Sequence, residues 1–353
     1  RIVPTRQRIV KKSLYAFELE QLKKELTAHS MPGFAGMQIF KWIYKQGKYN
    51  TESWSNVSQK VKSYIQQNMD MQLPKVIRYK MAKDGTLKFL IALKDNKTVE
   101  MVVIFSKNRT TLCISTQIGC AIGCTFCHTA TMGFERNLTV EEIVGQFLLA
   151  RQWLQDRDPQ EKKINNIVYM GQGEPLLNFT NVNKATNIFM QEQGLGIGQR
   201  KITLSTSGLV PQMEKLDSFP PINIAISLHA TQNTIRTRLI PINRIYNLEK
   251  LFETIKKIPL KAHRYITYEY LLIAGLNDRK EDILGLDRLI EKKKSKINLI
   301  PFNEYPQAHY KKPSEQKTLW FKDQLIKLGH VCTVRETKGE DILAACGQLK
   351  AQN

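Results

Sequence analysis

Hydrophobic positions divide the chain into an N-terminal part with a helical period and a longer part in which strand-like and helix-like runs alternate. In the N-terminal part, Leu19, Leu22 and Leu26 recur at helical spacing, and a Met-Pro-Gly turn at Met31–Gly33 precedes a second helical run. We therefore expect short helices over about the first 75 residues.

Two extended runs follow the helical part. Lys88–Leu93 and Thr98–Phe105 have the apolar and β-branched character of strands, and the charged segment Lys94–Lys97 between them is typical of a turn. We predict a β extension over residues 81–110, which separates a helical N-terminal accessory domain at 1–80 from the rest of the chain.

From residue 111 the pattern alternates between short apolar runs and amphipathic helical runs. The apolar runs predict strands at 112–116, 164–170, 201–205, 222–228, 266–273 and 297–301. Helices are predicted at 140–153, 181–191, 248–257 and 280–292, and a last helix (314–328) and strand (331–335) follow. Strand–helix alternation favours a parallel sheet, and six units are too few for a closed eight-stranded barrel. We predict an α/β fold, a partial (β/α)6 barrel over residues 111–353.

The charge of the chain adds a candidate partner class. The 353 residues carry 53 Lys and Arg against 32 Asp and Glu, and the first 80 residues hold 15 basic and 5 acidic residues. Basic surfaces attract polyanions, because each cation near a phosphate releases a counterion. The N-terminal helices are therefore predicted to bind the backbone of RNA. The alternative is a helical cap over a catalytic domain.

The cysteine content and the lack of long apolar segments indicate the compartment. Six cysteines in a chain of this length do not form the dense framework of a small secreted protein, so metal-bound or catalytic thiols are favoured. No uninterrupted apolar stretch approaches the ~20 residues of a membrane span. We expect a cytoplasmic protein with no membrane partner.

The strongest chemical signal is the spacing of Cys120, Cys124 and Cys127. Three thiolates from one loop can hold a four-iron cluster and leave its fourth iron without a protein ligand. Zinc is the alternative, but a closed zinc site needs a fourth ligand, and the side chain of His128 diverges from its neighbour Cys127.

This spacing, with Phe126 before the last cysteine, resembles the radical S-adenosylmethionine (SAM) superfamily. The resemblance implies a 4Fe–4S cluster on the three cysteines and SAM bound to its open iron, with reductive cleavage of SAM to a 5′-deoxyadenosyl radical. In the Gly-Gln-Gly-Glu-Pro segment after the second strand, Gly173 allows close approach of the backbone and Glu174 can accept hydrogen bonds from the SAM ammonium.

Further polar residues stand at or just after the ends of predicted strands, where barrel enzymes build their active sites. Each residue alone is an ordinary cap or loop residue, but together with the cysteine loop they indicate a cofactor site. We predict that SAM is bound by Gly173, Glu174, Ser205, Ser227, Leu228, His229 and Asn303.

Longer motifs narrow the resemblance to the RlmN/Cfr family of radical SAM methyltransferases, which methylate an adenosine in the peptidyl-transferase region of 23S ribosomal RNA. The motifs lie at Thr111–Cys120, Met170–Asn178, Thr203–Gly208, Ser227–His229, Pro241–Asn243, Ile297–Pro301 and Asp341–Leu349. The similarity runs from about residue 85 to the end. One departure is Gln172, where family members usually carry Met.

The resemblance also assigns roles that the residues alone do not reveal. It implies that Cys346 carries the methyl group as S-methylcysteine, that Cys113 attacks Cys346 to release the product through a transient disulfide, and that Glu100 removes the ring proton. Without the resemblance, Cys113 and Cys346 would be interpreted as buried structural thiols and Glu100 as a surface residue of a strand. Cys332 matches no motif and is expected in the core.

Three functions remain to be weighed. RlmN-type methylation of adenine C2 in 23S rRNA, with tRNA as a second substrate used by some members, is favoured by the loop His128–Arg136. A Cfr-type enzyme would methylate C8 and confer antibiotic resistance on ribosomes. A non-catalytic RNA-binding metalloprotein would need none of Glu100, Cys113 and Cys346. We expect a flavodoxin- or ferredoxin-like electron donor and a monomer.

Overall fold

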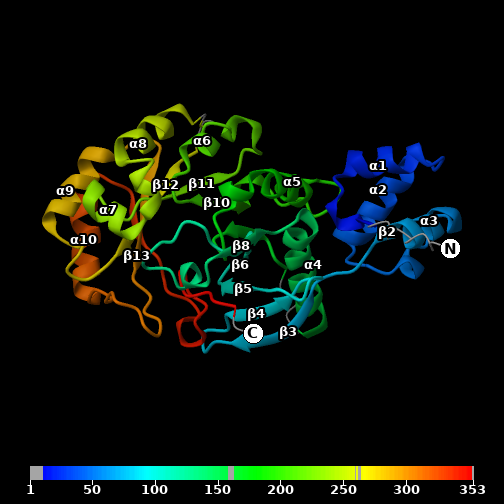
Figure 1. Cartoon of the computed structure of the whole chain (residues 1–353), viewed down its shortest axis with the longest axis horizontal. Coiled ribbons are helices and arrows are strands. Elements are labelled where there is room, and N and C mark those ends of the chain that lie inside the picture. The colour runs from blue at the N-terminus through cyan, green and yellow to red at the C-terminus, as the bar shows by residue number, and fades with distance from the viewer. Residues whose placement is uncertain (1–10, 158–162, 259, 261–263, 352–353) are drawn as a thin grey trace, which may run out of the picture.

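The protein consists of a small helical N-terminal lobe beside a larger α/β body (Figure 1). The computed structural model describes residues 11–157, 163–258, 260 and 264–351. In the described part no helix is long and apolar enough to cross a membrane.

The helices of the N-terminal lobe confirm the helical period of the sequence. The lobe contains α1 (Leu19–Ala28), α2 (Phe34–Phe40) and α3 (Gln59–Asn68), a π-helical turn at Lys41–Lys45, 3-10 turns at Leu14–Ala16 and Thr51–Ser53, and the short strands β1 (Lys12–Ser13) and β2 (Met69–Asp70). Leu19, Leu22 and Leu26 of α1 are buried together. Arg151 of the body joins the two parts, because its guanidinium donates to the carbonyl oxygen of Ile43 at 2.6 Å.

A ten-stranded sheet forms the body, in the order β14-β13-β12-β11-β10-β9-β6-β5-β4-β3. Seven neighbouring strands run parallel: β6 (Arg109–Cys113), β9 (Asn166–Tyr169), β10 (Ile202–Thr206), β11 (Asn223–Ser227), β12 (Ile266–Leu272), β13 (Ser295–Pro301) and β14 (Cys332–Val334). The predicted partial barrel is confirmed, and β14, which pairs parallel to β13 after the six units, confirms the last strand predicted at 331–335. Cys332 is buried there, as expected for a core residue.

The remaining three strands are antiparallel and extend the sheet beyond β6. They are β3 (Lys75–Met81), β4 (Leu87–Ala92) and β5 (Thr98–Ser106). β4 and β5 match the predicted strand pair. β3 begins inside the segment 1–80 that the sequence assigns to the helical domain. It is an edge strand with largely exposed residues, and its apolar residues Ile77, Tyr79 and Met81 alternate with Arg78 and Lys80, a strand-like pattern that the predicted domain boundary at residue 80 overlooks.

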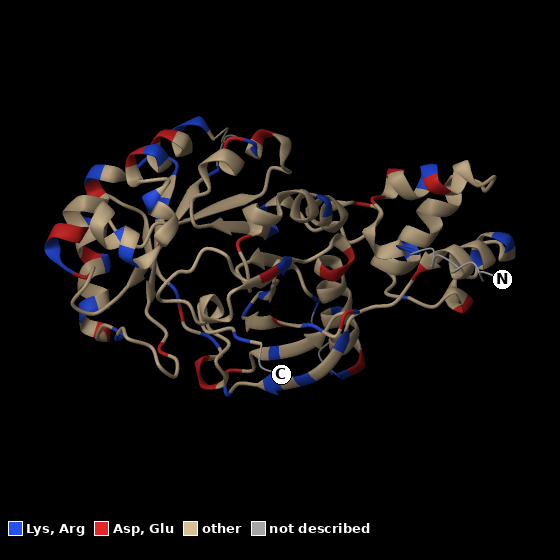
Figure 2. Ribbon diagram, viewed as in Figure 1, with Lys and Arg blue, Asp and Glu red and all other residues tan. Residues whose placement is uncertain are grey.

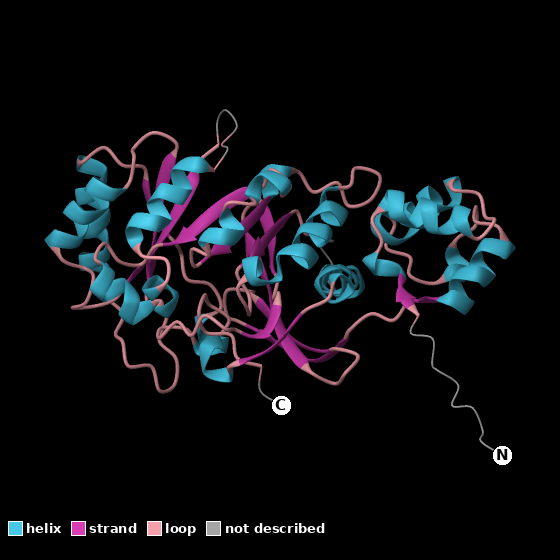
Figure 3. Ribbon diagram, turned by 45° about the horizontal axis from the view of Figure 1, so that its top comes forward, coloured by secondary structure: helices cyan, strands magenta, loops and turns pink. Residues whose placement is uncertain are grey.

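Helices cover the outer face of the parallel strands (Figure 3). They are α4 (Val140–Arg157), α5 (Phe179–Met190), α6 (Val210–Met213), α7 (Asn233–Leu239), α8 (Leu248–Lys257), α9 (Lys280–Leu289) and α10 (Glu315–Lys327). A small hairpin, β7 (Gln117–Gly119) with β8 (Phe134–Asn137), and 3-10 turns at 128–132, 175–178, 199–201, 216–218, 241–244 and 340–342 complete the fold. The sequence predicted neither α6 nor α7.

The C-terminal segment 343–351 lies against the cysteine loop and the antiparallel strands. The backbone amide of His128 donates to the carbonyl oxygen of Gly347 at 2.7 Å. Ala344 and Leu349 pack against Val102 of β5 and Cys113 of β6. This packing brings the last part of the chain to the edge of the sheet where β6 ends.

Candidate active site

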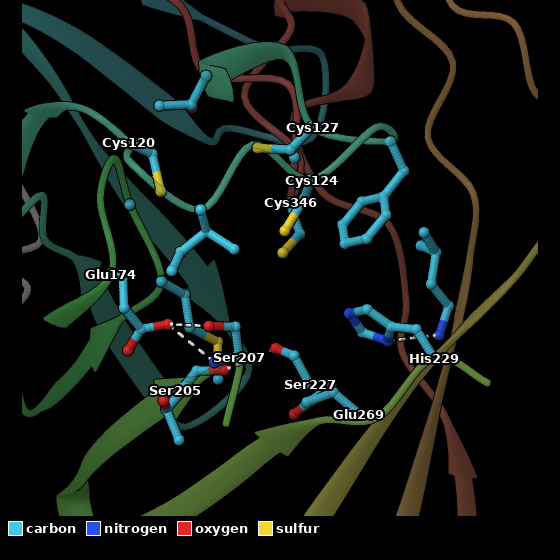
Figure 4. Close-up of a pocket in the computed structure, with 18 of the residues that line it drawn as sticks. Cys120, Cys124, Cys127, Glu174, Ser205, Ser207, Ser227, His229, Glu269 and Cys346 are labelled. Carbon is cyan, nitrogen blue, oxygen red and sulfur yellow. Dashed lines mark hydrogen bonds between the residues drawn. The ribbon is translucent and has the colours of Figure 1, made fainter. Parts of the chain in front are cut away.

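The three cysteines of the motif lie on a loop between β7 and the 3-10 turn His128–Met132, at the carboxyl edge of the parallel strands. The loop is tightly closed: the amide of Cys120 donates to the carbonyl oxygen of Gly133 at 2.8 Å. Gly119 makes this possible, because its φ is +71° and a β-carbon there would stand 1.8 Å from that same oxygen. Cys120, Cys124 and Cys127 all line one pocket (Figure 4).

The donor set of this loop fits an iron–sulfur cluster with one open iron. All six cysteines are free thiols, and burial raises the pKa of each of the three in the loop, to about 12 for Cys120. Binding to iron favours the thiolate and would offset this cost of burial. Within the described ranges, no three His, Cys, Asp or Glu side chains converge as the ligands of a single metal ion do.

Glu174 forms the wall of the pocket that faces the cysteines (Figure 4). Its Oε2 accepts hydrogen bonds from the amide and the hydroxyl of Ser207, both at 2.8 Å, and its Oε1 accepts from the amide of Leu176 at 3.1 Å. Burial raises the pKa of Glu174, and the bonds from Ser207 counteract that rise. The carboxyl group is thus held rigidly beside the cavity.

Ser205, Ser227 and His229 line the same pocket from the ends of β10 and β11. The hydroxyl oxygens of Ser205 and Ser227 are 3.4 Å apart. His229 has a left-handed backbone with φ of 58°, its Nδ1 accepts from the amide of Leu271 at 3.1 Å, and its ring stands edge-on to Phe126. The aromatic residue of the cysteine motif therefore packs against the fourth strand end.

Cys346 connects this pocket to a second cavity. It lines both, whereas Cys113, at the end of β6, lines only the second. Burial raises the pKa of Cys113 to about 12, and the neighbouring Cys346 thiol raises it further. Arg335, which lines both cavities, acts in the opposite direction and lowers the pKa of both thiols.

Comparisons with known proteins decide the family. Residues 114–286 match the model of the radical SAM superfamily. The fold matches the crystal structure of a radical SAM methyltransferase from Sphaerobacter thermophilus with a TM-score of 0.90 and 35% identity, over 97% of this chain and 100% of that one. The sequence is 41% identical to the dual-specificity RNA methyltransferase RlmN of Syntrophus aciditrophicus, over 95% of each chain. The chain belongs to the RlmN family.

A second relative gives the same result. RlmN of a Nitratiruptor species is 40% identical over 95% of this chain and 98% of its own. As a radical SAM protein of the RlmN family, the chain uses a 4Fe–4S cluster and SAM, as predicted from the cysteine motif.

Five of the seven residues predicted to bind SAM line the pocket of this RlmN-family chain: Gly173, Glu174, Ser205, Ser227 and His229. Leu228 and Asn303 are not among the lining residues. Leu228 is fully buried between β11 and β12, where its amide donates to the Glu269 carbonyl at 3.0 Å. Asn303 supports the C-terminal segment, because its Nδ2 donates to the carbonyl oxygen of Cys346 at 3.2 Å.

In the Gly-Gln-Gly segment, contacts with neighbouring parts of the chain explain why Gly173 has no side chain. A β-carbon on Gly173 would lie 2.5 Å from the Cβ of Gln117, so this glycine allows two backbone segments to meet. Gln172, the position that departs from the family pattern, is buried and does not line the pocket. Its Oε1 accepts from the amide of Glu100 at 3.1 Å, which places it behind β5.

Glu100 lies outside both cavities in this structure. It is buried on β5, with its Oε1 3.1 Å from Nζ of Lys88 and its Oε2 accepting from the amide of Lys350 at 2.9 Å. Lys88 also donates to the carbonyl oxygen of Leu343 at 3.1 Å. The C-terminal segment therefore occupies the carboxylate that the family resemblance assigns as a base.

Arg236, which sequence reasoning missed, connects several walls of the site. It is fully buried in α7, and its guanidinium donates to the carbonyl oxygens of Leu228 (3.1 Å), Ser207 (2.7 Å) and Ser227 (3.0 Å). A fourth bond, at 2.9 Å, goes to Oδ1 of Asn243. The motif Pro241–Asn243 was the available signal, since its asparagine is the side-chain partner of this buried cation.

Arg236→Met is expected to lower the free energy of unfolding by about 3 kcal/mol, because four buried oxygens lose their donor. Chemical denaturation of the two proteins measures the difference. Arg244→Met, which removes an exposed guanidinium close in the sequence, should change stability by less than about 0.5 kcal/mol. Equal effects of the two substitutions would contradict the bridging role of Arg236.

His229 should make the protein acid-sensitive. Burial lowers the pKa of His229 from 6.5 to about 3, so the folded protein keeps the ring neutral where the unfolded chain protonates it. Stability is therefore full above pH 6.5 and is lost as the pH falls towards 3, by about 1.4 kcal/mol per unit.

Denaturation curves measured between pH 6.5 and pH 3 test whether the protonation of His229 causes this loss of stability. His229→Asn, which suits the left-handed backbone, should flatten the pH dependence even if it lowers stability throughout. His309→Asn, at an exposed position, should leave the slope unchanged. An unaltered slope in His229→Asn would show that another group titrates.

Proposed function

We propose that this chain methylates C2 of an adenosine in 23S rRNA, and an adenosine in tRNA as a second substrate, through S-methylated Cys346. The observation that carries the proposal is the position of Cys346 between two cavities, one lined by the cluster cysteines and the other by Cys113. A carrier of a methyl group needs access both to the site where it is loaded and to the thiol that releases it.

The cluster and SAM, when bound, supply a methyl group and a 5′-deoxyadenosyl radical. Cys346 takes the methyl group on its sulfur and gives up its thiol proton. Its S-methyl group then loses one hydrogen atom to the radical, and the carbon adds to the adenine ring. The adduct then gives its ring proton to Glu100 and one electron to the cluster, which would be the electron acceptor when bound, and Cys113 attacks the sulfur of Cys346. The sulfur–carbon bond breaks, a disulfide forms, and the released carbon takes up a proton.

Each remaining residue has a positional task. Glu174, Ser205, Ser227 and His229 hold SAM opposite the cysteine loop. Glu100 receives the ring proton, a role that requires the amide of Lys350 to leave its carboxylate first. The C-terminal segment must therefore shift when RNA enters.

Two features support RNA as the substrate. Both RlmN relatives are dual-specificity RNA methyltransferases. Lys and Arg residues occur along the N-terminal lobe and the antiparallel strands (Figure 2), which suits a surface that follows a phosphate backbone. A Cfr-type C8 reaction is not favoured. We further propose that the protein acts in the cytoplasm as a monomer and receives electrons from a flavodoxin- or ferredoxin-like carrier.

Nucleoside mass spectrometry tests the proposal. Unmodified 23S rRNA is incubated without oxygen with reconstituted protein, SAM and a reductant, and the expected product is 2-methyladenosine. A product of 8-methyladenosine would keep the mechanism and contradict the regiochemistry. No methylated adenosine from rRNA or tRNA, despite cleavage of SAM, would show that the substrate assignment is wrong.

A further inference from the structure

The cluster loop has an inner and an outer side. Its thiols line the pocket, where SAM and the RNA base bind during catalysis in the proposed function. On the outer side, Ala121, Gly123 and Thr125 are exposed. A protein that docks on these exposed residues would therefore stand next to the segment that carries the three cysteines.

Thr125, on this outer side, forms hydrogen bonds with the end of α7 and with Tyr310. Its amide donates to the carbonyl oxygen of Leu239 at 3.0 Å, and its hydroxyl donates to that of Arg238 at 3.0 Å. The same hydroxyl lies 2.8 Å from the hydroxyl of Tyr310, and the guanidinium carbon of Arg238 stands 5.8 Å from the centre of the Tyr310 ring. A residue between two cluster cysteines thus contacts the backbone of an exposed arginine and the hydroxyl of Tyr310, and the guanidinium of that arginine lies over the Tyr310 ring.

The charge of this surface is positive and uncompensated. Within the described ranges, no carboxylate lies at ion-pair distance from Arg238 or from Arg244, and both arginines are exposed. The lysines after Tyr310 differ, because Lys311 lies 3.6 Å from Glu304 and Lys312 lies 3.1 Å from Glu340.

Arg244 is the second exposed arginine of this region, and it ends a 3-10 turn, Pro241–Arg244, that packs against α7, the helix of Arg238. Asn243 of the turn donates to the hydroxyl of Thr237 of α7 at 2.8 Å. Next to Arg244, the side chain of Ile245 is 59% exposed. Cations around an exposed apolar residue are typical of small, transient docking surfaces. We call Thr125, Arg238, Arg244, Ile245 and Tyr310 the outer loop surface.

We infer that the outer loop surface is the docking site for an acidic one-electron carrier protein of the flavodoxin or ferredoxin class. The inference rests on the proposed function, which requires a reduced cluster. In the transfer, the carrier loses one electron and the cluster gains it, and no atom or proton moves between them. Negative charges around the carrier's cofactor steer it to Arg238 and Arg244, and Thr125 lies between the carrier and the cluster.

The test compares two double variants with equal changes of charge. Arg238→Glu/Arg244→Glu reverses the outer loop surface. Arg200→Glu/Lys201→Glu reverses two exposed residues just before β10, at the amino edge of the strands and therefore away from the cluster loop. Binding of a bacterial flavodoxin is measured at low and at high salt. Reduction of the reconstituted cluster is followed by electron paramagnetic resonance, without RNA.

We expect the first variant to bind flavodoxin at least about tenfold more weakly at low salt and to lose the salt dependence of binding. Its cluster should accept electrons from flavodoxin at a correspondingly lower rate, whereas dithionite, which needs no docking, should reduce both variants equally. The control variant should behave like the unaltered protein. Because neither readout uses RNA, both stand even if the proposed RNA substrate is wrong.

Two outcomes overturn the inference. Equal flavodoxin binding by the two variants would remove the outer loop surface as the docking site. Unchanged flavodoxin binding together with weaker binding of 23S rRNA fragments would assign the surface to RNA instead. Slower reduction by dithionite as well would show that the substitutions disturb the cluster loop itself. In that case Arg238→Gln, which removes the charge without reversing it, should still weaken flavodoxin binding for the inference to hold.

Discussion

Cys346→Ala should abolish RNA methylation, with the yield of methylated adenosine falling at least about a thousandfold. The substitution removes the sulfur that carries the methyl group in the proposed reaction, and no other described thiol lines both cavities. Cys120, Cys124 and Cys127 are unaltered, so the protein should still bind iron and sulfide in the usual ratio and cleave SAM. Nucleoside mass spectrometry and cleavage of SAM, measured on the same sample, separate the two effects.

The matched control is Cys332→Ala. Cys332 is a buried thiol of β14 that lines neither cavity, so its loss should lower stability without removing methylation. If Cys346→Ala kept methylating RNA while Cys332→Ala behaved as expected, the carrier role of Cys346 would be wrong.

Cys113→Ala should leave the RNA covalently attached to the protein. In the proposed reaction, the product is released only when a second thiol attacks the sulfur of Cys346, and Cys113 is the thiol that lines the second cavity with it. Without this attack, the carbon that has added to the adenine stays bound to Cys346. A denaturing gel with labelled RNA should show a shifted protein band, and mass spectrometry after nuclease digestion should place the nucleotide on Cys346.

The double variant Cys113→Ala/Cys346→Ala is the control for this covalent protein–RNA adduct. It lacks the sulfur that forms the bond, so it should give no shifted band. Release of free methylated RNA by Cys113→Ala at the rate of the unaltered protein would contradict the resolving role. A shifted band in the double variant would mean that another residue forms the link.

The sequence predicted the parts of this protein whose signals are local. The cysteine loop was recognisable because its three ligands lie within eight positions of one another. The parallel strands were recognisable because each is a compact apolar run followed by an amphipathic helix. The bounds of α8, Leu248–Lys257, coincide with the predicted range.

Features assembled from distant segments were not predictable in this way. The partners of Arg236 come from the ends of two strands and from a later turn, so no spacing within α7 marks it as a buried cation. Glu100 looks like a surface residue of a strand, and its burial depends on the amide of Lys350, 250 positions further on. β3 is a different case, because the alternation of a strand is present at Ile77–Met81, but the segment directly follows the N-terminal helices and was predicted as part of their domain.

Gly119 has a consequence for the gene. Its β-carbon position lies 1.8 Å from the carbonyl oxygen that also fixes Cys120, so any side chain would push the first cluster ligand out of place. No amino-acid replacement relieves this contact, since every residue other than glycine has a β-carbon. In a library of random variants selected for ribosomal methylation, codon 119 should therefore admit only synonymous changes. Selection should treat this residue, which has no side chain, as strictly as the cysteines.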